Sequence, residues 1–279
     1  MIRMARRTGV LAVLGGCLGT ACLPWSAGRG DAAGSLGTVT SGMLAGSEEL
    51  EARGEHHRFY RAGAQRHATP ELAGLVRRAA SRVAATHPGS VLLVGDISAA
   101  HGGFIGGHRS HRSGRDVDFA FFLATPDGEP RPGFPLPRLD RLGAGVRDDE
   151  PCRFDDARNW ELVEALLADA GAEVQWIFVS RGLKTRLLSF ALRRGRDPEL
   201  IERAAAMLHQ PGDSAWHDDH FHVRIYCPVG TAGDACLDTG PVRPGVAVRP
   251  ATGAETPRWD DSGFTDLALE GLETGTDRP

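Results

Sequence analysis

Several common catalytic motifs are missing from this sequence. It contains no G-x-S-x-G nucleophile elbow, no S-x-x-K motif with a partnered K-T-G, and no P-loop. These absences argue against a Ser/His/Asp hydrolase, a serine acyl-enzyme and a phosphate-binding role of the P-loop type. No CxxC pair is present either, which argues against a structural zinc site closed by cysteines.

Clustered positive charge is also scarce. The chain carries 32 Lys and Arg residues against 36 Asp and Glu residues, a formal net charge of -4, and no basic block stands out beyond its start. Nucleic-acid binding requires clustered cations that neutralise phosphates. We therefore expect no nucleic-acid partner.

Long apolar runs are missing except near the start. Arg3, Arg6 and Arg7 precede an apolar run from Val10 to Leu23 that is broken by glycines. This pattern is typical of a secretory signal, and the run is shorter than the about 20 residues that span a membrane. We predict a signal peptide and export of the mature protein.

The signal contains a candidate lipid-attachment site. The tetrapeptide LGGC that ends at Cys17 resembles the bacterial lipobox, and Cys22 ends a poorer copy. An ordinary signal cut near Ala27 or Ala33 fits the same segment, because motifs this short often match by chance. A lipid anchor through Cys17 and ordinary cleavage therefore both stay open.

Few cysteines remain after the signal, namely Cys152, Cys227 and Cys236. Export permits disulfides, and Cys227 and Cys236 enclose a short loop with Pro228 and two glycines. We predict a disulfide between them. Cys152 then has no evident partner.

The length of 279 residues fits one domain of roughly 200 residues with tails. We assign residues 1–27 to the signal peptide. Residues 28–54 are rich in Gly, Ala and Ser and are predicted to form a flexible linker. The folded domain is expected at residues 55–240, and the Pro-, Gly- and acid-rich residues 241–279 are predicted to be a disordered tail.

Hydrophobic periodicity predicts four helices and four strands. Thr69 can cap a helix that starts at Pro70, and Asp197 can cap another. The predicted helices cover residues 69–86, 159–170, 182–193 and 198–208, and the predicted strands cover residues 91–97, 116–123, 174–179 and 219–226. This order favours an α+β fold in which helices flank a small antiparallel sheet. Residues 125–151 are predicted to be a surface excursion that lines a substrate groove.

Histidines gather in two short segments. Seven of the eleven histidines belong to them: His101, His108, His111, His209, His217, His220 and His222. In HRSHRSGRDVD, His111 stands seven residues before Asp118, and a loop entering a strand can bring these side chains together. In HDDHFH, His220 and His222 are two apart on a predicted strand, so they leave the same face of the sheet.

These clusters predict a metal centre. Imidazole and carboxylate are ligands that zinc accepts, and three protein ligands with an open fourth position are typical of a catalytic zinc site. A structural site is closed by four ligands, usually with cysteine. The clusters therefore favour a hydrolytic zinc centre.

The same segments carry a family resemblance. GGFIGGHRSHRSGRDVDFAFF, NWELVEALL, WIFVSRGLKTRLL and HDDHFHVRIYCP resemble the penicillin-insensitive murein endopeptidases, within the group that includes lysostaphin-type peptidases, D-Ala-D-Ala carboxypeptidases and the hedgehog signalling domain. The resemblance runs from about Phe59 to Cys236, and GGHxSHxxGxDVD is its most specific motif. This sequence carries fewer cysteines than the family pattern.

The resemblance implies a set of zinc ligands. They are His111, Asp118 and His222, on the face of the small sheet. Asp116 is the nearest rival of Asp118 for the carboxylate ligand. The alternative for Asp116 is a solvated or backbone-bonded carboxylate.

The resemblance also implies the catalytic side chains. His220 is the implied general base or proton shuttle in a metal-assisted amide hydrolysis. His217 and His108 are implied at the rim of the site. They can stabilise an oxyanion, bind peptide or orient a ligand.

The implied activity is cleavage of the D-alanyl-meso-diaminopimelyl cross-links between peptidoglycan stem peptides in a bacterial periplasm. Two alternatives stay open, a zinc D,D-carboxypeptidase that trims stem peptides and a zinc-bearing module that binds peptidoglycan without turnover. His220 and His217 beside the ligands favour turnover, because a binding module needs no base. The oligomeric state does not follow from the sequence.

Overall fold

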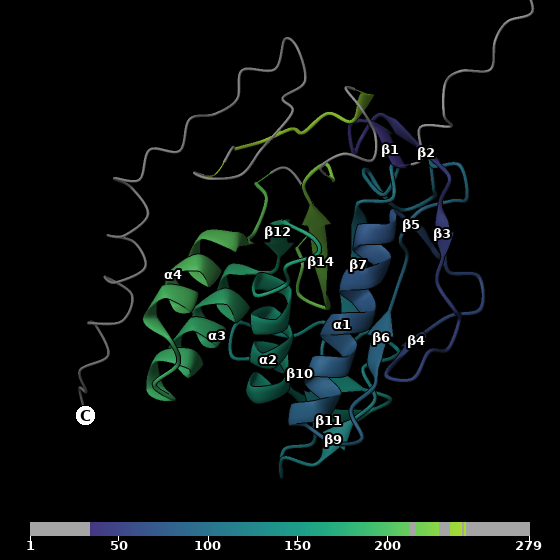
Figure 1. The fold of residues 1–279 in the computed structure, drawn as a ribbon. Helices are drawn as coiled ribbons and strands as arrows, with labels where there is room; N and C mark the ends of the chain where they lie inside the picture. Colours follow the sequence, from purple (N-terminus) through teal and green to yellow (C-terminus); the bar gives the residue numbers. More distant parts are fainter. Residues whose placement is uncertain (1–33, 213–215, 229–234, 242, 244–279) are drawn as a thin grey trace, which may run out of the picture. The chain divides into compact units, whose positions relative to one another are not determined.

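A six-stranded sheet organises the fold (Figure 1). The computed structural model describes residues 34–212, 216–228, 235–241 and 243, all within one compact unit. The strand order is β13 (Leu208–His209), β12 (Val174–Phe178), β14 (His220–Ile225), β7 (Asp116–Ala120), β6 (Leu92–Val94) and β4 (His57–Phe59). The inner strands pair antiparallel, as predicted, whereas the edge strands β13 and β4 run parallel to their neighbours.

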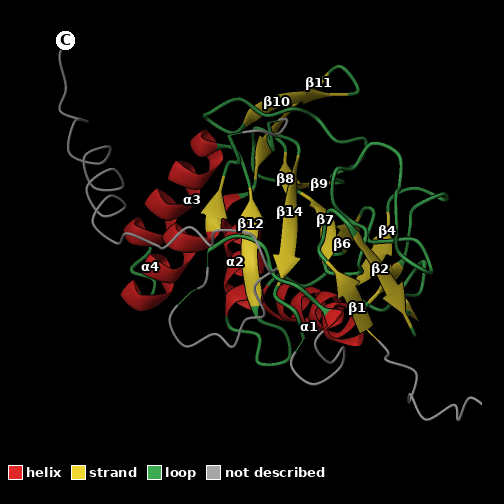
Figure 2. Cartoon of the chain, turned by 90° about the horizontal axis from the view of Figure 1, so that it is seen from above, coloured by secondary structure: helices red, strands yellow, loops and turns green. Residues whose placement is uncertain are grey.

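Four helices within the described residues gather on one side of this sheet (Figures 1 and 2). They are α1 (Pro70–Thr86), α2 (Asp156–Leu167), α3 (Arg181–Arg193) and α4 (Pro198–Met207). Thr69 and Asp197 cap α1 and α4, as predicted. Helix α2 starts earlier than predicted because Asp155 accepts the N–H of Arg158 and caps it. The α+β class is confirmed.

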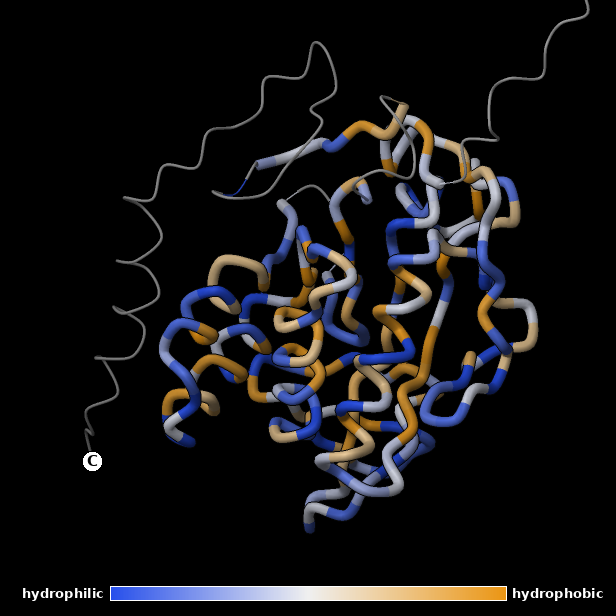
Figure 3. Tube along the Cα trace, viewed as in Figure 1, coloured by the Kyte–Doolittle hydropathy of each residue, from blue (hydrophilic) through white to orange (hydrophobic). Residues whose placement is uncertain are grey.

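The core lies between the helices and one face of the sheet. Val117 and Phe119 of β7 and Phe221 and Val223 of β14 are fully buried in it, and hydrophobic positions recur along the helices and central strands (Figure 3). Because strand side chains alternate, the residues between them face the other way. That open face carries the histidines and carboxylates.

The predicted surface excursion forms a second sheet. Within the described residues its strand order is β10 (Ala144–Arg147), β11 (Glu150–Phe154), β8 (Leu123–Ala124) and β9 (Pro130–Arg131). The predicted strand at residues 116–123 is therefore two strands, β7 and β8, in different sheets. A continuous apolar pattern does not reveal where a chain changes sheet.

The prediction of a flexible linker at residues 28–54 is wrong for residues 34–54. This segment forms β1 (Gly34–Gly37), β2 (Gly42–Ala45) and β3 (Glu48–Glu49), and β3 pairs with β5 (His67–Ala68). Leu44 and Leu50 are buried. The glycines serve the β1–β2 turn: Gly37 has φ of 69°, a conformation that favours glycine, and a Cβ at Gly42 would lie 2.3 Å from a backbone oxygen.

The C-terminal boundary also needs correction. Arg243 lies in the predicted disordered tail, yet it is buried, donates to backbone oxygens of β12 and lies over the Trp176 ring. The predicted disulfide between Cys227 and Cys236 is confirmed, and Cys152 is a buried free thiol. The signal peptide with Cys17 and Cys22 lies outside the described residues. Among the described helices, none has the length and apolarity needed to cross a membrane.

Candidate metal centre

Strands β7 and β14 place the first part of the site. Their antiparallel register sets Asp118 opposite His222 and Ala120 opposite His220. Directly paired residues on one face have side chains about 5 Å apart. Asp118, His222 and His220 therefore meet on the open face, with the shared face of the two histidines as predicted.

The loop before β7 delivers His111. Its backbone adopts φ of 64°, a left-handed conformation uncommon outside glycine. The backbone N–H of His111 donates to Asp116 Oδ2 (3.3 Å), and its Nδ1–H donates to the carbonyl oxygen of Ile97 (2.8 Å). These two bonds fix a fully buried imidazole and leave its Nε2 atom facing Asp118.

Three candidate ligand atoms form a small triangle. His111 Nε2 lies 3.3 Å from Asp118 Oδ1 and 3.4 Å from His222 Nδ1, and His222 Nδ1 lies 3.5 Å from Asp118 Oδ1. A tetrahedral ion bound at about 2.0–2.1 Å separates its ligand atoms by about 3.3–3.4 Å. The triangle therefore has the dimensions of three zinc ligands.

Asp118 Oδ1 gives a separate sign of a cation site. This oxygen is fully buried, and no described residue gives it a hydrogen bond of good geometry. A buried carboxylate oxygen without a partner is costly, and a bound cation would remove that cost. The residues present thus fit a divalent metal.

Burial and neighbouring charges set the protonation of the three side chains in the triangle. Burial lowers the pKa of His222 to about 4. Burial would also lower the pKa of His111, but the carboxylates of Asp118 and Asp116 raise it to about 9. Burial would raise the pKa of Asp118, yet His111 and the neighbouring histidines hold it well below its usual range. Without a metal, Asp118 is therefore ionised and His222 neutral, the forms that bind metal, whereas His111 is protonated and gives up its proton when a cation takes its place.

Asp116 stands behind the triangle. Its Oδ1 atom accepts from His222 Nε2 (2.8 Å) and from Arg224 Nε (2.7 Å). A carboxylate on the far nitrogen of a ligand histidine fixes its tautomer and ring orientation. In this geometry Asp116 orients His222, while Asp118 faces the point where the three ligand atoms converge.

His220 reaches the same point from β14. Its Nδ1 atom bonds Asp219 Oδ1 (2.5 Å), and its Nε2 atom lies 3.6 Å from Asp118 Oδ1. Burial would lower the pKa of His220, but Asp118 and Asp219 raise it above its ordinary value. The ring is thus oriented by one carboxylate with its other nitrogen free for proton transfer.

His108 has a similar arrangement. Its Nε2 atom bonds Asp96 Oδ2 (2.9 Å), and its Nδ1 atom lies 3.7 Å from Asp118 Oδ2. Asp96 is buried and also pairs with Arg61. His108, His111 and Asp118 also hold ligand atoms within 4.8 Å of one another, but the triangle with His222 is tighter.

The site opens into a cleft of about 510 Å³, lined by His108, His217, His220, His222 and Phe178 among others. His217 packs on Phe178, with ring centroids 5.6 Å apart, and burial and the neighbouring histidines lower its pKa to about 4. His217 and His108 therefore lie at the rim of the triangle. The other two clustered histidines do not: His101 is exposed, and His209 lies on β13 against Trp176.

Sequence reasoning missed three residues of this site. Asp96 orients His108, and Asp219 orients His220. The third is Tyr60, whose hydroxyl oxygen lies close to Gly95. A Cβ on Gly95 would lie 2.6 Å from that oxygen and 2.9 Å from Asp118 Cβ. Burial and the charge of Asp118 raise the pKa of Tyr60 to about 12. Asp219 stands beside His220 in the chain, but no local pattern marks Asp96 or Tyr60.

This arrangement defines a class: α+β proteins with a histidine–carboxylate centre in a cleft on the open face of a sheet. The family model described as penicillin-insensitive murein endopeptidase matches residues 35–250, and the chain belongs to this family.

Curated relatives support this assignment. The penicillin-insensitive murein endopeptidase of Haemophilus influenzae is 31% identical over 77% of this chain and 77% of its own length. Proteins of that name from Escherichia coli O157:H7 and Klebsiella pneumoniae are 29% and 28% identical, each over 90% of this chain and 86% of its own length.

Proposed function

We propose that this chain is a zinc-dependent endopeptidase that hydrolyses the D-alanyl-meso-diaminopimelyl cross-links of peptidoglycan. The observation that carries the proposal is the triangle of His111 Nε2, Asp118 Oδ1 and His222 Nδ1, with edges of 3.3 to 3.5 Å. The names of the relatives, murein endopeptidases, supply the substrate. Zinc suits a ligand set of two imidazoles and one carboxylate.

In this proposal His111, Asp118 and His222 hold the zinc, which supplies Lewis-acid activation of water and of the amide carbonyl. His220 is the proton carrier. Asp219 fixes the His220 ring, so Nε2 accepts a proton from the attacking water and returns it to the leaving amine.

The rim residues act on the substrate. His217 is neutral at neutral pH, because its pKa is about 4, so it serves as a hydrogen-bonding group rather than a cation. His108, oriented by Asp96, presents Nδ1 to the cleft. Both contact the peptide or the oxygen that becomes negatively charged in the transition state.

A digest of purified cross-linked muropeptide dimers, read by mass spectrometry, tests the proposal. We expect conversion of dimers to monomers, loss of activity with a chelator and recovery with zinc. Penicillin should have no effect, since no serine acyl-enzyme forms. Release of terminal D-Ala alone would indicate a carboxypeptidase, and binding without cleavage would indicate a peptidoglycan-binding module.

We further propose that the mature protein works in the periplasm, where its substrate lies. The arginine-rich start with its apolar run supports export. Attachment of lipid to Cys17 is tested by mass spectrometry of the mature amino terminus. An unmodified terminus beyond Cys22 would exclude the anchor.

A further inference from the structure

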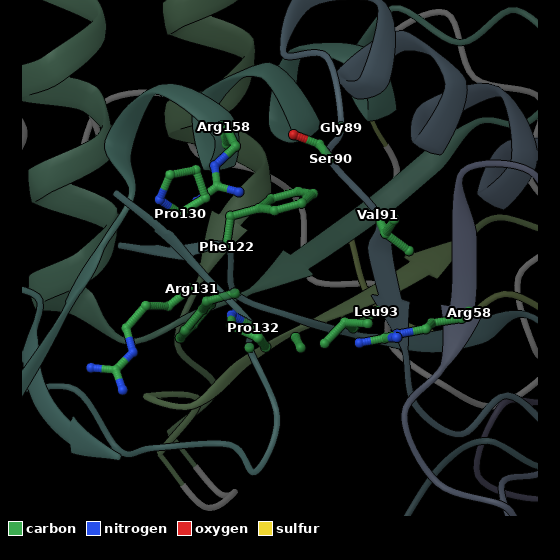
Figure 4. A pocket seen from close by; sticks show the side chains of 13 residues that line it. Arg58, Gly89, Ser90, Val91, Leu93, Phe122, Pro130, Arg131, Pro132 and Arg158 are labelled. Atoms are coloured by element: carbon green, nitrogen blue, oxygen red, sulfur yellow. The ribbon is translucent and has the colours of Figure 1, made fainter. Parts of the chain in front are cut away.

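A second hollow lies on the open face of the central sheet (Figure 4). Its volume is about 270 Å³, and it is lined by residues of β4, β6 and β7 and by the loop that follows β9. Arg58, Leu93, Ala120 and Pro132 are among them. A hollow of this size holds one or two side chains rather than a whole ligand. We call it the Arg58 hollow.

Strand register relates this hollow to the metal centre. Ala120 is opposite His220 on β14, and Arg58 is opposite Leu93 on β6. The pairing of Val94 with Phe119 sets Leu93 beside Ala120. His220, Ala120, Leu93 and Arg58 thus form one row across four strands, about 14 Å long at about 4.8 Å per strand step. Four extended peptide residues span about this distance.

The charged residues that line the hollow are all positive. Arg58, Arg131 and Arg158 line it, and none of its lining residues is Asp or Glu. Arg131 donates to a backbone oxygen (3.1 Å), and Arg158 is paired with Asp155 (2.7 Å). Arg58 forms no side-chain hydrogen bond or ion pair with any residue that the structure describes, and Figure 4 shows it beside Leu93 with its guanidinium turned into the hollow.

An aromatic pair separates the Arg58 hollow from the metal centre. The rings of Tyr60 and Phe134 stack with centroids 5.0 Å apart, and Phe134 is 41% exposed. The neighbouring Gly133 lies close above the sheet, since a Cβ on it would lie 3.3 Å from Ala120 Cβ. Because Ala120 beneath Gly133 is only 2% exposed, a peptide that leaves the metal centre toward Arg58 passes over Gly133 and the exposed Phe134 ring rather than along the strands.

We propose that the Arg58 hollow is a subsite for a carboxylate of the peptide substrate. The occupant is an acidic peptide arm that extends about four residues from the cleaved bond. A guanidinium without an internal partner suits a carboxylate, which it binds with two parallel hydrogen bonds. This inference rests on the proposed function, because it takes the substrate to be a peptide held at the metal centre.

The test compares wild-type enzyme with Arg58→Met on two substrates, a cross-linked muropeptide dimer and the same dimer with its free carboxylates converted to amides. On the acidic dimer, Arg58→Met should raise KM about tenfold and leave kcat within about twofold, since a charge-assisted hydrogen bond is lost far from the reacting atoms. On the amide dimer the substitution should change KM little. Arg58→Lys should recover part of the loss.

Arg153→Met is the matched control, because Arg153 is an exposed arginine on β11 that does not line the hollow. Equal KM values for wild type and Arg58→Met on the acidic dimer, or an equal rise on both dimers, would overturn the subsite. If wild-type enzyme cuts neither dimer, the proposed function fails instead. Calorimetric binding of the two dimers to wild type and Arg58→Met then decides the subsite by the same comparison.

Discussion

Asp96 bonds one nitrogen of His108 at 2.9 Å and thereby turns the other nitrogen toward Asp118, 3.7 Å away. The same segment of chain also positions Asp118 and His111. The backbone oxygen of Asp96 accepts the N–H of Asp118, and the next residue, Ile97, accepts from His111. One short stretch after β6 thus positions three side chains of the centre.

The bond between Asp96 and His108 predicts a positioning role for Asp96. Asp96→Ala should lower kcat on cross-linked dimers about 10- to 100-fold with zinc still bound, the usual effect of removing the partner that orients a site histidine. Asp96→Asn should recover much of the rate, because its amide oxygen can accept from His108. Unchanged kcat in Asp96→Ala would exclude the role.

The two carboxylates of β7 should behave differently in metal analysis. Asp118→Ala should abolish zinc binding, since Asp118 Oδ1 belongs to the ligand triangle. Asp116→Ala should weaken zinc binding about 10- to 100-fold without abolishing it, because it removes only the partner of His222 Nε2. Metal content after dialysis against buffers of fixed free zinc measures both. Full occupancy in Asp118→Ala with loss in Asp116→Ala would mean that their roles are exchanged.

His220→Ala should separate chemistry from metal binding. We expect zinc content to stay at the wild-type value while kcat falls about 10²–10⁴-fold, the usual contribution of general acid–base catalysis. KM should change less, because proton transfer contributes mainly in the transition state. His217→Ala is the control at the rim and should alter KM or kcat with zinc in place. Loss of metal in His220→Ala and its retention in His222→Ala would reverse the assignment.

Lys184, the one lysine of the chain, gives a prediction for the pH dependence of stability. Burial lowers its pKa from 10.5 to about 8, although its Nζ atom donates to the backbone oxygen of Ala205 (2.7 Å). Between these pH values the unfolded chain binds the proton and the folded chain does not, so Lys184 makes stability rise as pH increases. Below about pH 8 the folded protein carries a charged Lys184 that is partly removed from water, and this lowers its stability.

Lys184→Met should therefore be more stable than wild type by the largest margin at pH 7. This difference in stability should shrink as pH rises from 8 to 10.5. Melting temperatures of both proteins across that range measure it. Carbon-13 NMR of protein labelled at lysine reads the titration directly, since only one side chain carries the label. A lysine pKa near 10.5 would contradict the prediction.

Local signals in the sequence were sufficient for much of the fold. The helix starts at Pro70 and Pro198 follow from capping side chains and from the fixed φ of proline, which act within one turn. Likewise, the alternation in β14 puts His220 and His222 on one face whatever the strand pairs with.

Other parts needed contacts between distant segments. Residues 34–54 look like a glycine-rich linker, and they are ordered because Leu44 and Leu50 are buried and β3 pairs with β5. The split of residues 116–124 between two sheets likewise depends on which strands lie beside them. The local pattern of either segment does not specify the strands with which it pairs.

The sequence by itself determined the residue types that can bind a metal, their spacing, the capped helices and the disulfide between Cys227 and Cys236. Tertiary structure alone set Asp118 Oδ1, rather than an oxygen of Asp116, at the corner of the triangle with His111 Nε2 and His222 Nδ1, and set Asp96 against His108. It also decided that Arg58 lies on the face of the metal centre. The physical reason is that short-range propensities act within a few residues, whereas strand register and burial join residues more than a hundred positions apart, as they do His111 and His222.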